Sequence, residues 1–274
     1  MDDRTGTLAG AAETDYDGWQ ARTALFLSSQ SVSMFGSMLV QYAIIWYVTL
    51  TTESGLMLTL STLVGFLPQI VISLFAGVWA DRYHRKSLII GADVLTAAST
   101  LALAILFFVG YRELWLIFVV SGLRSVGAGI QAPAVNALLP QIVPRDRLMK
   151  VNSVNSTIQP FIMIVTPVAS GALLSFSRLE SIFFIDVVTA VAAVGLLVLL
   201  KVPPLPRTPA AARRGYLDDL AAGLAYIKGN SAIRRLFVFF GFVFFLVTPA
   251  AFLSPLLVAR SFGDEVWRLT ANEV

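Results

Sequence analysis

Long apolar stretches dominate this sequence and restrict its fold more than any other feature. A helix needs about 20 apolar residues to cross the roughly 30 Å hydrocarbon layer of a bilayer. Seven stretches reach this length, and four of them contain no charged residue. They span residues 23–50, 56–80, 87–109, 114–139, 152–175, 180–201 and 236–259. Because backbone polar groups cannot stay unpaired in lipid, each stretch is predicted to be a helix, and the chain an all-α membrane protein.

The composition argues against several classes of protein. Hydrophobic residues make up 57% of the 274 residues and charged residues only 14%, whereas soluble domains carry about 25% charged residues. The chain has no cysteine and a single histidine, His84, so we expect no catalytic or metal site. It has no HExxH, GxSxG or Walker motif, which makes an enzyme the least supported interpretation. The net charge of +3 does not indicate a nucleic-acid partner, because the basic residues lie between the apolar stretches.

Lysine and arginine residues are distributed unevenly between the two sides of the predicted membrane region. The N-terminus and the loops on its side hold 15 of them, and the opposite side holds four. The four are Arg112, Arg178, Arg260 and Arg268. Because loops rich in lysine and arginine stay in the cytoplasm, we expect a multi-pass protein with a cytoplasmic N-terminus.

Four segments are predicted along the chain. Residues 1–22 form a cytoplasmic tail, which is acidic and is not a cleaved signal peptide. Residues 23–201 form a six-helix transmembrane half, and residues 202–235 form a cytoplasmic linker with an amphipathic helix. Residues 236–274 hold the seventh helix and the start of a further part.

Three charged residues are predicted to lie inside the membrane, where each costs about 2.5–3.5 kcal/mol on insertion scales. Arg124 lies near the middle of the fourth span, and Asp93 and Asp186 lie within the third and sixth spans. A buried arginine stays protonated, so it requires a carboxylate or an aqueous cavity. Two interpretations are open: groups that face a substrate cavity, or ion pairs that fix helix packing. Because burial favours the neutral form of a carboxyl group, Asp93 and Asp186 are candidate proton carriers.

Polar side chains also follow one face of each of three predicted helices. Such a face either forms hydrogen bonds between helices or lines water. Three such faces, one of them with a midplane arginine, favour an aqueous cavity. The candidate lining residues are Gln30, Ser33, Ser37, Gln41, Arg124, Gln131 and Gln159.

A motif between the second and third spans resembles a family signature. Residues 77–86 have the sequence Gly-Val-Trp-Ala-Asp-Arg-Tyr-His-Arg-Lys, which is similar to the major facilitator motif G-x-L-A-D-R-x-G-R-K. Here His84 replaces the second glycine and Trp79 replaces the leucine. The resemblance implies that Asp81, Arg82, Arg85 and Lys86 make cytoplasmic contacts that stabilise an outward-open state, and that Gly77 belongs to the same conformational motif.

Further segments resemble the macrolide-efflux and enterobactin-exporter branch of that family. They include Leu123-Arg124-Ser125-Val126-Gly127-Ala128-Gly129 and Phe35-Gly36-Ser37. The segment 166–171 is a degenerate form of the antiporter motif G-P-x-x-G-G, in which Pro167 and Gly171 match. The resemblance implies a major facilitator type bundle of twelve helices in two halves, of which this chain holds about seven. We therefore expect a fragment or a disrupted gene product.

The resemblance implies a secondary transporter in a bacterial inner membrane. Such a transporter would export amphipathic small molecules, such as macrolide-like drugs, by proton antiport with alternating access. Its energy source would be the proton gradient, and we expect no cofactor. The expected partners are the substrate, the lipid bilayer and a second transmembrane half. The alternatives are an exporter of siderophores or other metabolites, an inactive truncated transporter, and a seven-helix membrane protein that transports nothing.

Overall fold

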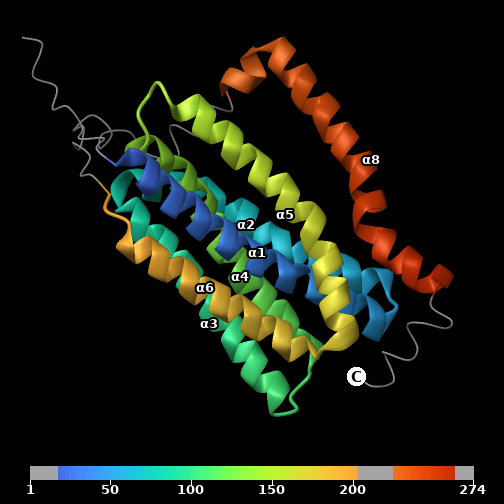
Figure 1. The fold of residues 1–274 in the computed structure, drawn as a ribbon. Helices are drawn as coiled ribbons and strands as arrows, with labels where there is room; N and C mark the ends of the chain where they lie inside the picture. The colour runs from blue at the N-terminus through green and yellow to red at the C-terminus, as the bar shows by residue number, and fades with distance from the viewer. Residues whose placement is uncertain (1–17, 203–224, 263–274) are drawn as a thin grey trace, which may run out of the picture.

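Seven long helices make up nearly all of the described chain (Figure 1). The computed structural model describes residues 18–202 and 225–262, without the side chains of residues 81, 249–255 and 258–262. The helices are α1 (Trp19–Thr52), α2 (Gly55–Arg82), α3 (Arg85–Phe108), α4 (Leu114–Ile142), α5 (Leu148–Phe176), α6 (Leu179–Leu199) and α8 (Ser231–Phe262). No strand occurs within the described ranges, and the predicted all-α fold is confirmed.

All seven helices are long and apolar enough to cross a bilayer. Five of the predicted stretches fall wholly inside these helices, and the stretches 87–109 and 180–201 run one or two residues past the helix ends. The helices are longer than most of the stretches because polar and charged residues extend them beyond the hydrocarbon layer, as Arg85 and Lys86 do at the start of α3. The amphipathic helix predicted within 202–235 falls largely outside the described residues.

A junction of two residues turns the chain from α1 into α2. Glu53 has a left-handed backbone (φ 47°), which ends α1. The hydroxyl of Ser54 then accepts a hydrogen bond from the N–H of Met57 at 3.4 Å. This bond satisfies one of the N–H groups that every helix start leaves unpaired. Because the junction is so short, α1 and α2 run in opposite directions.

Two apolar clusters fill the bundle, one toward each end. At the end where α1 meets α2, Ile44, Phe107 and Phe183 belong to the first cluster, and the two phenylalanine rings meet edge to face at 5.8 Å. Phe26 and Leu138 belong to the second cluster at the opposite end. The charged and amide side chains predicted to lie in the membrane occupy the layer between these clusters.

Close helix contacts hold this middle layer in place. Helix α1 packs against α5 and α6, α4 packs against α2 and α3, and α3 packs against α6. Small residues make the closest approaches possible. A Cβ atom on Gly129 of α4 would lie 2.8 Å from the carbonyl oxygen of Gln69 on α2. A Cβ atom on Gly36 of α1 would lie 1.9 Å from the hydroxyl of Thr189 on α6, so neither position has room for a larger residue.

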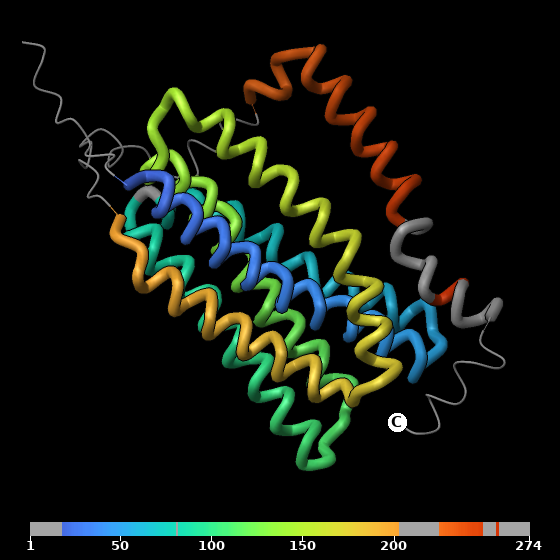
Figure 2. Tube along the Cα trace, viewed as in Figure 1, coloured from blue at the N-terminus to red at the C-terminus, as the bar shows by residue number. Residues whose placement is uncertain are grey.

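Helix α8 stands apart from the other six (Figure 2). It contacts only the edge of the bundle, chiefly α1 and α2. There Leu256 packs against Ile45 and Leu58. None of the residues in 231–248 is buried inside the described structure. The six helices α1 to α6 therefore form the packed unit that carries the site described next.

Candidate functional site

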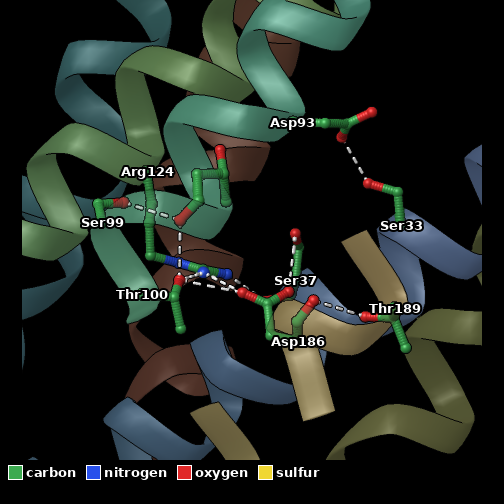
Figure 3. Close-up of polar contacts among 9 residues, drawn as sticks. Ser33, Ser37, Asp93, Ser99, Thr100, Arg124, Asp186 and Thr189 are labelled. Atoms are coloured by element: carbon green, nitrogen blue, oxygen red, sulfur yellow. Dashed lines mark hydrogen bonds and ion pairs between the residues drawn. The ribbon is translucent and has the colours of Figure 1, made fainter. Parts of the chain in front are cut away.

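An arginine and an aspartate form a buried ion pair in the layer between the two apolar clusters (Figure 3). Arg124 Nη1 of α4 lies 2.5 Å from Asp186 Oδ2 of α6, and the two side chains are 6% and 2% exposed. Taking two charges out of the aqueous phase is costly, and here each charge is neutralised by the other. The carboxylate that the sequence requires for Arg124 is thus Asp186 and not Asp93.

Groups on two further helices complete the hydrogen bonding of this pair. The hydroxyl of Thr100 on α3 lies 3.0 Å from Asp186 Oδ2 and also accepts a hydrogen bond from Arg124 Nη1. Arg124 Nη2 donates to the carbonyl oxygen of Ser37 on α1 at 3.0 Å. The hydroxyl of Ser37 lies 3.5 Å from Asp186 Oδ1. The pair therefore joins α1, α3, α4 and α6 at one point.

A second polar cluster surrounds Asp93, which lies seven residues before Thr100 on α3 and so on the same helix face. Asp93 Oδ1 accepts hydrogen bonds from the hydroxyl of Ser33 at 2.6 Å and from Gln131 Nε2 at 2.8 Å. Gln131 Nε2 also lies 3.4 Å from Gln30 Oε1. Asp93 is 3% exposed, and within the described part of the chain its Oδ2 has no hydrogen-bond partner and neither oxygen has a basic partner.

A cavity of about 270 Å³ lies beside these two clusters. Residues of α1, α2, α4 and α5 line it, together with Thr96 of α3. Six of the residues predicted to line a cavity are part of its wall, namely Gln30, Ser37, Gln41, Arg124, Gln131 and Gln159. The seventh, Ser33, is buried beside Asp93 instead. The carboxylates of Asp93 and Asp186 lie behind the wall and are held by groups that line it.

Carboxamides are the main polar groups of this wall. Seven of them line the cavity: Gln30, Gln41, Gln69, Gln131, Asn136, Asn155 and Gln159. Sequence reasoning did not select Gln69, Asn136 or Thr100. Gln69 directly follows Pro68, and its N–H donates to Ser125 Oγ of α4 at 2.9 Å. The seven-residue spacing from Asp93 was the signal for Thr100.

The basic residues of the 77–86 motif form caps on helix ends. Arg85 donates from Nε to the carbonyl of Ala80 at 3.1 Å and from Nη1 to that of Ala137 on α4 at 2.9 Å. Lys86 Nζ donates to the last carbonyls of α6, those of Val198 and Leu200, both at 2.9 Å. Cations stabilise helix C-termini because unpaired carbonyls and the helix dipole make those ends negative.

The remaining residues of that motif make no such contact in the described structure. The side chain of Asp81 lies outside the described residues, and Arg82 is exposed. A Cβ atom on Gly77 would meet nothing within 4 Å, so packing in this structure does not explain the glycine. The resemblance therefore has a clear physical basis here at Arg85 and Lys86.

The segment 166–171 lies in the C-terminal half of α5 and contains a proline. The hydroxyl of Thr166 donates to the carbonyl of Ile162 at 2.5 Å, and Pro167 has no N–H to donate within the helix. Ser170 Oγ donates to the carbonyl of Leu39 on α1 at 3.2 Å, which ties the two helices together. A Cβ atom on Gly171 would lie 4.0 Å from Trp46 Nε1, an ordinary contact.

Comparison with known proteins identifies relatives for nearly the whole chain. The family model described as Major Facilitator Superfamily matches residues 24–270. The chain is 30% identical over 259 residues to macrolide efflux protein A of Streptococcus pyogenes, which covers 94% of this chain and 64% of that protein. It is 24% identical over 251 residues to the enterobactin exporter EntS of Shigella boydii, which covers 92% and 57%. The chain thus spans less than two thirds of the length of these curated relatives.

A solved structure has the same fold at low sequence identity. It is a bacterial homologue of the human lysosomal transporter Spinster, in an inward-facing and unoccupied conformation. The match has a TM-score of 0.61 at 13% identity, and it covers 93% of this chain and 58% of the other. This likeness shows the fold.

Proposed function

Since the chain belongs to the major facilitator superfamily, as its motif and fold predicted, we propose that this multi-pass membrane transporter exports macrolide-like amphipathic molecules in exchange for protons. One observation carries the proposal: a cavity between the two apolar clusters is joined through Gln131 to the buried carboxyl group of Asp93. An antiporter needs a substrate site and a proton site that influence each other. The two lie here within one hydrogen-bonded cluster.

The two buried aspartates have different surroundings, which divides the proposed roles between them. Asp186 is neutralised by Arg124 at 2.5 Å, so a proton would have to displace an arginine. Asp93 accepts only neutral donors, and one of its oxygens is unpartnered within the described chain. A buried carboxylate without a counter-charge is costly, and a bound proton removes that cost. We assign proton binding to Asp93, and Asp186 holds Arg124 in the cavity wall.

Gln131 can couple the proton to the substrate. Its Nε2 donates to Asp93 Oδ1, and a hydrogen bond to an ionised acceptor is about twice as strong as one to a neutral acceptor. Protonation of Asp93 therefore weakens its hydrogen bond with Gln131, which together with Gln30 lines the cavity. Substrate and proton then compete through one amide group, as exchange requires.

The export direction follows from topology and from a second wall. We propose a bacterial inner membrane location with the N-terminus in the cytoplasm, because of the basic loops on that side. Alternating access needs a partner wall that faces α1, α2, α4 and α5, which a second helical half would supply. In this scheme the protein moves its substrate unchanged, without enzyme chemistry or a cofactor, and it requires neither a metal nor nucleic acid.

Macrolide-like substrates are favoured over siderophores by the charge of the wall. The chain resembles exporters of both kinds. An anionic, metal-chelating molecule would need an available cation in the cavity. Arg124 is the charged residue among those that line it, and its charge is already matched by Asp186.

Accumulation of radiolabelled erythromycin in cells tests the proposal. The chain is produced together with the second half of a macrolide efflux relative, with and without a protonophore. We expect reduced accumulation that the protonophore restores, and we expect Asp93→Asn to abolish export. Asp146→Asn is the matched control, because this loop carboxylate is 70% exposed. Full export by Asp93→Asn would refute the proton assignment, and unchanged accumulation by the unmodified pair would refute macrolide export.

A separate experiment tests whether transport requires a second cavity wall. The 274-residue chain alone, purified and reconstituted into liposomes, should not move erythromycin along an imposed proton gradient. Gradient-dependent uptake by that preparation would contradict the requirement for a facing half.

A further inference from the structure

The cavity wall is built mostly from carboxamides and apolar groups, and this composition limits what it can recognise. Gln30 and Gln41 come from α1, Gln69 from α2, Gln131 from α4 and Gln159 from α5, and two asparagines add to them. Four different helices thus direct the same functional group toward one volume. Each carboxamide offers two N–H donors and a carbonyl acceptor, and none offers a charge.

The same wall offers no unmatched charge. Arg124 is the charged side chain among the residues that line the cavity, and Asp186 neutralises it from behind the wall. No carboxylate belongs to the lining within the described ranges of the chain. A cationic group would therefore find no counter-ion on this wall, and an anionic group would have to compete with a carboxylate already 2.5 Å from the guanidinium.

Two of the amides have unused donors. Gln30 Nε2 and Gln41 Nε2 are buried and, among the described residues, have no hydrogen-bond partner. They lie eleven residues apart on α1, which is about 16 Å along a helix. A buried donor without an acceptor destabilises the structure until a ligand supplies an oxygen. Because both Nε2 atoms are covered in this structure, each side chain must rotate toward the cavity before ligand oxygens spaced along one molecule can reach them.

The apolar part of the lining suits a ligand with an oily face. Met34 and Met38 lie on α1 between the two glutamines, and Phe66 lies on α2. Methionine side chains are flexible and polarisable, so they adapt to apolar surfaces of different shape. The wall thus pairs adjustable apolar contacts with fixed carboxamides.

From these observations we infer that the cavity selects uncharged, oxygen-rich amphiphiles through carboxamide hydrogen bonds, with Gln41 as a specificity-determining residue. The inference rests on the proposed transport function and adds the chemical class of substrate. A macrolide would be held by its lactone, hydroxyl and ether oxygens, and its amino group would contribute little to binding.

Equilibrium dialysis with the purified chain in lipid nanodiscs tests this directly. The three probes are erythronolide B, which is an uncharged macrolactone aglycone, erythromycin, which carries a protonated amine, and tetraphenylphosphonium, a cation without oxygen. We expect the Kd values of the two macrolactones to agree within about threefold and tetraphenylphosphonium to show no saturable binding. Erythromycin binding more than about thirtyfold tighter than its aglycone, or saturable tetraphenylphosphonium binding, would overturn the inference. Absence of binding by both macrolactones would overturn it as well.

Substitutions at Gln41 sharpen the test. Gln41→Leu removes the amide and should weaken both macrolactones about tenfold, the loss of one good hydrogen bond. Gln41→Glu keeps the shape but adds a charge, so it should weaken the aglycone and create measurable tetraphenylphosphonium binding. Gln141 of α4 does not line the cavity, so Gln141→Leu and Gln141→Glu are the matched controls and should bind like the unmodified chain. Far-UV circular dichroism confirms that every variant is folded.

Binding and export can fail independently. The expected binding pattern without erythromycin export by the complete pair would refute the proposed function and leave the selectivity intact. Export with a binding preference for cations would refute the selectivity and leave the transport function intact.

Discussion

Replacing Asp186 with asparagine leaves the guanidinium of Arg124 buried without its counter-charge. The replacement keeps the size of the side chain and removes the negative charge of the carboxylate that lies 2.5 Å from Arg124 Nη1. Arginine cannot shed its proton in a protein, so the charge stays in a site where the side chain is 6% exposed. Breaking a buried pair in this way costs about 3–5 kcal/mol of unfolding free energy. We expect the loss of unfolding free energy in Asp186→Asn to fall in this range.

The reverse substitution should cost less unfolding free energy. In Arg124→Met the remaining carboxylate can become neutral by binding a proton, and Thr100 and Ser37 still lie within hydrogen-bond distance of it. The guanidinium left in Asp186→Asn has no such route to the neutral form, so the loss in Arg124→Met should be the smaller of the two.

A double-mutant cycle completes this test. Arg124→Met combined with Asp186→Asn removes both charges, so no uncompensated charge stays buried. We expect the double variant to lose several kcal/mol less than the sum of the single variants. The measurement is reversible unfolding in mixed SDS micelles, followed by far-UV circular dichroism. Losses that add up, or equal losses for both single variants, would refute the reasoning from charge burial.

Three further outcomes are expected for the bundle. Gly129→Ala should lower the unfolding free energy by about 1–3 kcal/mol, because its Cβ would lie 2.8 Å from a backbone oxygen of α2. Gly91→Ala is the control and should cost nothing, because a Cβ there meets nothing within 4 Å. Unfolding in SDS compares the two variants. Lys86→Met should remove two caps and speed amide hydrogen exchange at the end of α6, and unchanged exchange there would contradict the capping role. Ser125→Ala should cost about 0.5–1.5 kcal/mol, because it removes the hydrogen bond that the half-buried Gln69 N–H of α2 donates to Ser125 Oγ. Exchange mass spectrometry should show faster amide exchange next to Pro68.

The sequence identified the groups of the polar layer but not their partners. It placed Arg124 near the midplane and offered Asp93 and Asp186 as equivalent carboxylates. The structure distinguishes them, because the tip of Arg124 meets α6 at Asp186, while Asp93 faces Ser33 and Gln131. Hydropathy along one segment has no information about which neighbouring helix stands opposite, or at what height.

Polar faces on single helices predicted part of the cavity for the same reason. Gln30 and Gln41 lie on the predicted face of α1 and line the cavity, but Ser33 between them is turned toward α3. Gln69 and Asn136 do not belong to any of the predicted polar helix faces, so the sequence did not predict that they line the cavity. Whether an isolated amide meets the cavity depends on the rotation of its helix, which packing sets.

The sequence by itself determined that seven segments are helices long enough to cross a membrane. In lipid, a segment must pair its own backbone polar groups, so any apolar stretch of sufficient length forms a helix. Its motif also identified the family. Only the tertiary structure decided which buried carboxylate neutralises Arg124, which one has no basic partner in the described chain, and that carboxamides form much of the cavity wall. These contacts join residues as far apart as Ser37 and Asp186, 149 positions along the chain, and they exist only after α1, α3, α4 and α6 have packed together.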